Sequence, residues 1–466
     1  MKLNIEIKNL GQIKRAKFKV RPITVLTGPN GTGKSFFTKS LYSILNVINT
    51  NVYHIDLNRN IHNCNKYFSD YIRVLSHSGK NDYNKIEEFT LRLENLEHEL
   101  HKAALGLDLT EYISYSKSKV NEVEQLLSDF NQYIDSLSQT KTKKKSILVI
   151  SNKIKKALIE LKNRLTDRNT FYSISLGENF SNELKENFQV SNLSELISFG
   201  EKKTTIKIDD IATIEFEKTV QFNIKHHFIN KISSLSRVVF FESPAYWKVR
   251  DALILAKNKT EFPYFLRKES NNQLSGVPKY FYDLNDALKI NTKIKSTINI
   301  NALTKKIENS LGGEFIFSGD ELRFKDFKSK KEISTNLISF GMTNLGMIHA
   351  LLKKEVITSG SFVFIDEPET NLHPKWQVLL MDVLIELANM DINIVIATHS
   401  VDMLKALEVG LKDKKKEQAQ DFMAIHYLDT DGQLLDFESK LPMKQLIEAR
   451  LELTSPYESL FFKGWS

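Results

Sequence analysis

The chain has 466 residues, of which 41% are hydrophobic and 26% charged, a composition typical of a folded globular protein with one large elaborated domain or two to three units. Its net charge of +8 permits a nucleic-acid partner without requiring one, because a solvated basic surface explains the charge equally well. The single cysteine, Cys64, excludes an internal disulfide, and the lack of a signal-peptide pattern or of any apolar run near ~18 residues predicts a soluble cytoplasmic protein with no membrane segment.

A glycine-rich loop follows the first strongly apolar segment. Residues 23–35 read ITVLTGPNGTGKS, and the next residues, FFTKSLYSILNVI, have the apolar spacing of a helix. A strand, a loop of the form GxxxxGKS and a helix are the context of a phosphate-binding loop, in which backbone N–H groups and the helix N-terminus bind phosphate oxygens. Lys34 would reach the β- and γ-phosphates, and the Ser35 hydroxyl would bind Mg²⁺. The expected nucleotide-binding residues are Asn30, Gly31, Gly33, Lys34, Ser35 and Phe36.

The region that follows is expected to be helical. Apolar residues recur in steps of three and four over residues 86–107, 123–137 and 147–165, which predicts three helices with one apolar stripe each. The stripes are short, so we expect a short antiparallel coiled coil or a helical bundle. The basic run KTKKK at 141–145 is interpreted as a solvated connection, with contact to nucleic acid or an acidic partner as the alternative.

Strand patterns return after residue 200. Residues 201–225 alternate between apolar and polar side chains, and residues 313–326 predict a hairpin that turns at Gly319 and Asp320. Residues 236–256 predict a buried strand, a proline turn and a helix. Within this helix Tyr246, Trp247 and Arg250 are either nucleotide or partner contacts or, for the two aromatics, core residues.

Two acids and a histidine follow later apolar strands. The stretch FVFID, residues 362–366, ends at Asp366, and Glu367 comes next; the stretch IVIATHS, residues 394–400, carries His399 near its end. A phosphate-binding loop needs a carboxylate from a second strand to hold the metal, so Asp366 is the expected Mg²⁺ partner. Glu367 would polarise the attacking water and His399 would contact the γ-phosphate. The alternatives are an ordinary acidic turn and a structural histidine.

These motifs together resemble ABC-type ATPases of the branch that includes SMC, RecF and OLD-like proteins. The matching stretches are GPNGTGKS, FVFIDEPETNLHP, ATHS and LISFGMTNLG, the last at residues 337–346. The resemblance implies an α/β fold: a P-loop head with a mixed sheet, interrupted by a helical, short coiled-coil insertion. It also implies ATP and Mg²⁺ as cofactors, and two heads that sandwich two ATP molecules.

The same resemblance assigns residues to the contact between heads. Ser339 and Gly341 match the signature loop, which meets the phosphate-binding loop of the other head, whereas Phe340 and Met342 depart from the family's glycine and glutamine. Asn371 falls in the loop that crosses the dimer interface. The family's glutamine loop stays unassigned, because Glu242 and Ser243 stand where the glutamine is expected.

The chain is therefore expected to contain four parts. They are residues 1–55 (head with the phosphate-binding loop), 56–200 (helical insertion), 201–410 (head with the signature loop and acidic strand) and 411–466 (C-terminal hairpin and tail). Asp429 to Gly432 is interpreted as a hairpin turn, so no Toprim nuclease is expected. The tail aromatics Phe461, Phe462 and Trp465 either anchor a neighbouring chain or fold back onto the sheet.

The resemblance extends to the ATPase components of anti-phage systems such as PARIS and Septu. It implies a homo-oligomer built from head-to-head dimers, which holds and controls a separate effector, a nuclease or toxin, in response to DNA or a phage protein. The alternative is a DNA-maintenance ATPase of SMC or RecF type. A transporter subunit fits poorly, because the signature loop is degenerate and the insertion is large.

Overall fold

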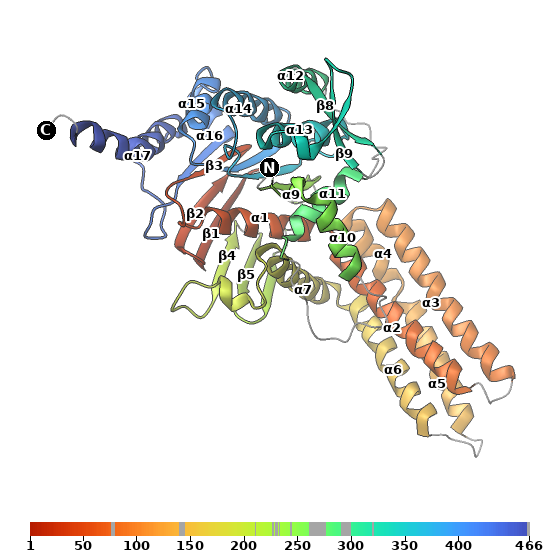
Figure 1. Cartoon of the computed structure of the whole chain (residues 1–466). Helices are drawn as coiled ribbons and strands as arrows, with labels where there is room; N and C mark the ends of the chain where they lie inside the picture. Colours follow the sequence, from red (N-terminus) through yellow and green to blue (C-terminus); the bar gives the residue numbers. More distant parts are fainter. Residues whose placement is uncertain are drawn as a thin grey trace. The chain divides into compact units, whose positions relative to one another are not determined.

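The computed structural model contains two compact units (Figure 1). The head unit comprises residues 1–49, 180–225 and 234–466, and the helical unit comprises residues 50–179 and 226–233. The structure describes residues 1–75, 80–138, 145–209, 211–225, 228, 232, 234–242, 245–260, 276–289, 300–318 and 321–463. The α/β fold with a helical insertion is confirmed.

A five-stranded parallel sheet forms the centre of the head unit. Its strand order is β13-β3-β12-β11-β7, and all four neighbouring pairs are parallel. The strands are β3 (Ile23–Thr27), β7 (Val238–Phe241), β11 (Phe362–Asp366), β12 (Asn393–Ala397) and β13 (Met423–Tyr427). Every residue of these strands is buried, as expected of a parallel sheet covered on both faces.

Helices cover both faces of this sheet (Figure 1). Helix α1 (Lys34–Asn49) packs against β7, β11 and β12, and α14 (Pro374–Asn389) packs against β12 and against α15 (Val401–Gly410). The other helices of this region are α13 (Phe340–Lys353), α16 (Lys416–Phe422) and α17 (Pro442–Lys463). No helix in the described ranges has the length and apolar character that crossing a membrane requires.

Antiparallel strands form two further sheets. The first has the order β2-β1-β4-β5-β6, and the second has the order β10-β9-β8. Their bounds are β1 (Leu3–Leu10), β2 (Ile13–Val20), β4 (Thr204–Ile208), β5 (Ala212–Phe216), β6 (Val220–Ile224), β8 (Gly313–Ser318), β9 (Glu321–Asp326) and β10 (Glu332–Ser334). The strands expected in 201–225 and 313–326 are thus confirmed, while the turn residues Gly319 and Asp320 lie outside the described residues.

Short helices connect the sheets of the head unit. They are the 3-10 turns η1 (Leu193–Leu196) and η3 (Thr335–Leu337) and the helices α9 (Ala245–Lys248), α10 (Arg250–Thr260), α11 (Lys279–Lys289) and α12 (Asn301–Leu311). Trp247 and Tyr246 pack on Phe281 of α11, and Arg250 is buried and donates through Nε to Asn285. Trp247 is therefore a core residue, whereas Tyr246 is half-buried against Phe281.

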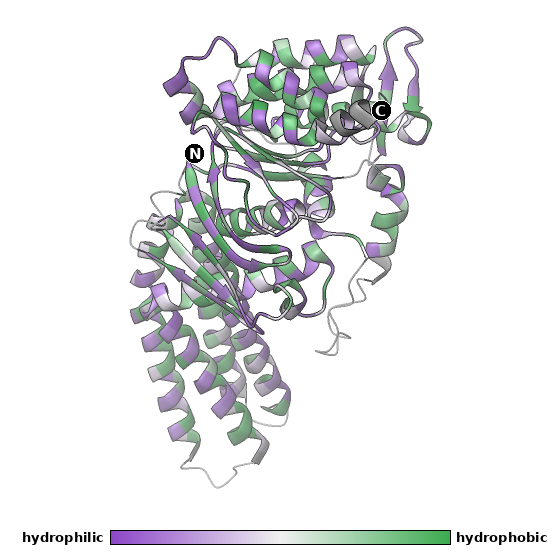
Figure 2. Ribbon diagram, turned by 90° about the vertical axis from the view of Figure 1, so that its left-hand side faces the viewer, coloured by the Kyte–Doolittle hydropathy of each residue, from purple (hydrophilic) through white to green (hydrophobic). Residues whose placement is uncertain are grey.

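The helical unit is a bundle rather than a long arm. Its helices are α2 (Val52–Leu75), α3 (Lys80–Gly106), α4 (Leu109–Ser118), α5 (Val120–Ser138), α6 (Lys145–Thr166) and the first part of α7 (Arg168–Phe188). Polar and apolar residues alternate along them, as in amphipathic helices (Figure 2). The predicted stripes face a core that contains the mutually packed rings of Phe68, Phe89 and Phe130. Residues 141–144 of the basic run lie outside the described residues.

The boundaries of the two units differ from those expected from the sequence, which placed the helical insertion at residues 56–200. The end of α7 belongs to the head, because Glu183 accepts a hydrogen bond from Asn46 of α1 (2.8 Å) and Asn187 donates one to Ser43 (2.9 Å). Hydrogen bonds between polar side chains cannot be predicted from the spacing of apolar residues, so the sequence did not reveal this boundary.

The segment 411–466 belongs to the head as well. Strand β13 pairs with β3 at the edge of the central sheet, and a turn follows in which Asp429 and Gln433 are hydrogen-bonded. The predicted return strand is reduced to one bridge between Leu428 and Leu434, after which α17 begins. The side chains of Phe461 and Phe462, like Trp465, lie outside the described part of the chain.

Candidate ATP-binding site

Lys34 opens α1 at the edge of the sheet where the parallel strands end. Its Nζ donates hydrogen bonds to the carbonyl oxygens of Gly28 (3.0 Å) and Pro29 (2.6 Å) within the glycine-rich loop. Burial lowers the pKa of Lys34 to about 8, against the opposing attraction of the carboxylates of Asp366, Glu367 and Glu369. The loop and the end of β11 therefore share one electrostatic environment, and the ammonium is still charged at neutral pH.

The rest of the loop divides into exposed and packed positions. Asn30 and Gly31 are exposed, Gly33 is buried and Ser35 is half-buried. The ring of Phe36 is half-buried and lies 5.3 Å from that of Phe188, so this side chain packs within the head.

Gly28 shows why the loop requires glycine at its start. Its φ is +125°, and a Cβ there would lie 2.0 Å from the carbonyl oxygen of Leu428. Only glycine tolerates both conditions. Leu428, the residue that follows β13, therefore packs directly against the glycine-rich loop. The C-terminal segment thus supports the loop, which the loop's own sequence motif does not reveal.

Asp366 is the last residue of β11 and is 5% exposed. Burial raises the pKa of its carboxyl to about 6; the Ser35 hydrogen bond opposes this shift, and the negative charge of Glu242 adds to it. Ser35 and Asp366, the two residues predicted to hold Mg²⁺, therefore meet in the folded chain.

Glu367 has an unusual backbone conformation. Its φ is +49°, in the left-handed region, and its N–H donates to the carbonyl oxygen of Ala397 at the end of β12 (2.8 Å). A non-glycine residue is held in this region at a cost of about 1–3 kcal/mol and most often at functional sites. The side chain of Glu367 is 55% exposed, and its Oε1 lies 4.0 Å from Nε2 of His399.

His399 follows β12 and lies close to the same loop. Burial and then the positive charge of Lys34 lower its pKa, so the imidazole is neutral at neutral pH. The structure thus brings Lys34 together with Glu367 and His399, which both follow it by more than three hundred residues in the sequence.

Glu369 is a site residue that the sequence analysis missed. Its carboxylate accepts hydrogen bonds from the backbone N–H of His399 (2.5 Å) and from Oγ1 of Thr398 (2.8 Å). It therefore ties the turn after β11 to the end of β12 and positions His399. The sequence held one indication of this role, because Glu369 is the third acid of the stretch DEPE at residues 366–369.

A second acidic strand end lies beside Asp366. Glu242 follows β7, whose partner strand is β11; its Oε1 pairs with Nζ of Lys39 (2.8 Å), and its other oxygen accepts a hydrogen bond from Tyr280. Lys39 lies one helical turn after Ser35. The signal for Glu242 was its position at the end of an apolar run, as for Asp366.

The predicted interface residues lie together on the head. Ser339 is exposed and caps α13, where its Oγ accepts from the N–H of Met342 (3.3 Å). A Cβ at Gly341 would lie 2.8 Å from the carbonyl oxygen of Asn371, which is exposed and has φ of +60°. The signature loop and the loop of Asn371 are therefore in contact within one chain.

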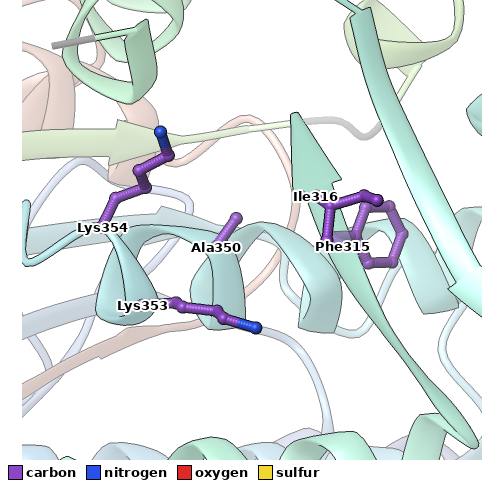
Figure 3. Close-up of a pocket in the computed structure, with 5 residues that line it drawn as sticks. All are labelled: Phe315, Ile316, Ala350, Lys353 and Lys354. Atoms are coloured by element: carbon purple, nitrogen blue, oxygen red, sulfur yellow. The ribbon is translucent and has the colours of Figure 1, made fainter. Parts of the chain in front are cut away.

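A separate pocket of about 280 Å³ lies between β8 and the end of α13 (Figure 3). Its lining residues are Phe315, Ile316, Ala350, Lys353 and Lys354. None of them belongs to the predicted site, and Nζ of Lys353 pairs with the carboxylate of Glu314.

The chain was compared with solved structures and with protein families. Similar solved structures include the SMC head domain from Thermotoga maritima (9% identity, TM-score 0.34, covering 92% of this chain and 94% of that one). Another is an Smc head domain with an extended coiled coil, bound to the C-terminal domain of ScpA, from Pyrococcus furiosus (11% identity, TM-score 0.37, covering 96% and 98%).

The family model provides the assignment. No curated protein matches the chain. The model described as "AAA ATPase domain" matches residues 1–404, a range that includes the glycine-rich loop, the acidic turn after β11 and His399. The chain therefore belongs to the AAA ATPase domain family.

Proposed function

We propose that this protein binds ATP with Mg²⁺ and hydrolyses it to ADP and phosphate between two heads that face each other. The observation that carries the proposal is the convergence of Lys34, Asp366 and Glu367 beyond the carboxyl ends of β3 and β11, the two parallel strands that flank β12, where ligands of such sheets bind.

The side chains suit the parts of phosphoryl transfer. Lys34, whose Nζ bonds to loop carbonyls, would exchange these partners for the β- and γ-phosphate oxygens. The backbone N–H groups from Asn30 through Gly33 would bind the remaining oxygens. His399, neutral and close to Lys34, would donate a hydrogen bond to the γ-phosphate.

The side chains of Asp366 and Ser35 are suited to hold Mg²⁺ in the proposed site. The described residues contain no group of three or more His, Cys, Asp or Glu side chains that could hold a metal ion. Mg²⁺ is typically bound by one or two carboxylates, with water and substrate phosphates completing the octahedron. Asp366 and Ser35 would supply the protein oxygens, and the ion would neutralise charge on the transferred phosphoryl group.

Glu367 would act as the base. Its side chain is 55% exposed, against 5% for Asp366, and its Oε1 lies 4.0 Å from Nε2 of His399. In the reaction, a water oxygen bonds to the γ-phosphorus, the bond from that phosphorus to the β–γ bridging oxygen breaks, and Glu367 accepts a proton from the water.

The surface around Ser339 supports a head-to-head dimer. Two apolar residues of the signature loop are exposed, Leu337 by 81% and Phe340 by 38%, beside the exposed Ser339 and Asn371. Exposed apolar side chains that cluster next to polar contacts are typical of protein interfaces. Ser339 and Gly341 would meet the ATP of the partner head, and Asn371 would cross the interface.

We also propose that this ATP-driven assembly controls a separate effector, a nuclease or toxin, in cytoplasmic anti-phage defence. The support is the resemblance of the motifs to the ATPase components of such systems. Co-purification with the product of an adjacent gene tests this role, and strongly salt-dependent DNA binding without an effector would favour the SMC- or RecF-like alternative.

The ATPase proposal is tested by nucleotide binding and phosphate release. Lys34→Ala should weaken ATP binding and abolish turnover, whereas Lys17→Ala, which removes an exposed lysine of β2, should leave both unchanged. Equal turnover by the Lys34→Ala variant and the unmodified protein would refute the site.

A further inference from the structure

The signature loop is held by a lysine from another element. Lys248, the last residue of α9, donates hydrogen bonds through Nζ to the carbonyl oxygens of Thr335 (2.5 Å) and Ile338. These carbonyls come from η3 and from the residue just before Ser339. The same Nζ lies 5.4 Å from the ring centroid of Phe340, within the range of a cation–π contact.

These contacts constrain the peptide that enters Ser339. The carbonyl of Ile338 belongs to the planar peptide unit that includes the N–H of Ser339, so a bond to this oxygen fixes the orientation of that unit. Thr335, at the other bond, also accepts from the N–H of Ile338 (3.2 Å), which closes η3. Lys248 therefore holds both ends of the short turn that presents Ser339 to solvent.

The lysine is itself firmly positioned. Its neighbour Trp247 is 6% exposed and packs on Phe281 of α11 at 5.2 Å between ring centroids. Two residues later, the buried Arg250 donates through Nε to Asn285 of the same helix (2.7 Å). A cation fixed on both sides can orient a loop, whereas a freely rotating surface lysine cannot.

The ammonium is also partly withdrawn from water. Lys248 is half-buried, and burial lowers its pKa. Carbonyl oxygens replace part of its hydration, and hydrogen bonds to a charged group are stronger than neutral ones. Leu337 and Phe340 are exposed, so their own packing does little to fix the loop. The hydrogen bonds from Lys248 therefore supply rigidity that the loop's side chains do not.

We propose that Lys248 is a positioning residue for the signature loop, which it holds in the conformation that Ser339 needs to reach the ATP of a second copy of this chain. The inference rests on the proposed function, because it assumes the head-to-head arrangement. Lys248 itself would contact no nucleotide. It would act only by holding the signature loop, which in turn meets the ATP bound to the partner head.

The test uses full-length protein in a Glu367→Gln background, which is expected to keep ATP bound. Lys248→Met removes the charge and both hydrogen bonds at nearly constant length, Lys248→Arg keeps a donor cation, and Lys331→Met is the matched control, an exposed lysine in the preceding turn. Two quantities are measured: the affinity of monomeric protein for a fluorescent ATP analogue at low protein concentration, and the ATP-dependent monomer–dimer dissociation constant by sedimentation.

We expect Lys248→Met to raise the dimer dissociation constant about tenfold, as the loss of charge-assisted hydrogen bonds implies, with unchanged ATP affinity of the monomer. Lys248→Arg should recover most of the loss and Lys331→Met should show none. An unchanged dimer dissociation constant in Lys248→Met would overturn the inference. A loss of monomer ATP affinity as large as the loss of dimer affinity would also overturn it, because it would indicate a merely structural role. A parent protein that stays monomeric with ATP refutes the proposed dimer and this inference with it.

Discussion

Replacing Asp366 by asparagine should stabilise the protein in the absence of Mg²⁺ and nucleotide while it abolishes turnover. Burial raises the pKa of this carboxyl from its ordinary 3.8 to about 6. When folding raises the pKa of an acid, the folded state is favoured most at a pH below the pKa of the unfolded chain, where the acid is protonated in both states. As the pH rises through the pKa of the folded state, this contribution to the free energy of unfolding is lost. The ionised carboxylate therefore lowers the free energy of unfolding by about 3 kcal/mol near pH 8, which is the cost of keeping the proposed Mg²⁺ ligand ionised.

The pH dependence makes this prediction specific. Near pH 5 the folded carboxyl is mostly protonated, and the same linkage reduces the cost to about half. Asparagine removes the cost at both pH values, so the stability advantage of Asp366→Asn should shrink by about half between pH 8 and pH 5.

Urea unfolding in EDTA, followed by tryptophan fluorescence, measures this difference. Among the described residues the tryptophans are Trp247 and Trp376, and both lie in the head unit, so the signal reports the unit that contains Asp366. Asp413→Asn, at an exposed position, is the control. A variant that is less stable than the unmodified protein, or a gain that does not change with pH, would refute the reasoning.

Three further changes test the site. Glu369→Ala removes the acceptor of the His399 N–H, so we expect a roughly tenfold lower kcat with little change in ATP affinity; equal kcat would contradict the positioning role. Gly341→Ala drives a Cβ against Asn371, and should weaken ATP-dependent dimerisation, seen by sedimentation, while monomer ATP binding persists. Because the pKa of Lys34 is about 8, ATP affinity measured by titration should fall as the pH rises through 8, and Lys34→Ala should remove that dependence.

The parts of the site that the sequence predicts share one feature. Lys34, Asp366 and His399 each follow an apolar strand, and the carboxyl ends of parallel strands meet at one edge of a sheet, so strand patterns suffice to bring them together. The helical insertion was equally predictable, because an apolar stripe every three to four residues specifies an amphipathic helix.

The remaining features depend on contacts that no local pattern encodes. Glu242 gains its place beside Asp366 from the register of β7 with β11, and its partner Tyr280 comes from α11, far along the chain. The contact of Leu428 with Gly28 likewise follows from β13 pairing with β3. Pairing between distant strands is fixed by tertiary packing, so single motifs do not reveal it.

The central claim is that Lys34 and Glu367 act on the same triphosphate. The most direct measurement is single-turnover hydrolysis of ATP by a Glu367→Gln variant, with bound nucleotide quantified in parallel. The account predicts that ATP binds with nearly unchanged affinity and that hydrolysis falls by about 10²-fold or more, since the amide cannot accept a proton from water. Hydrolysis by Glu367→Gln at the rate of the unmodified protein would contradict it.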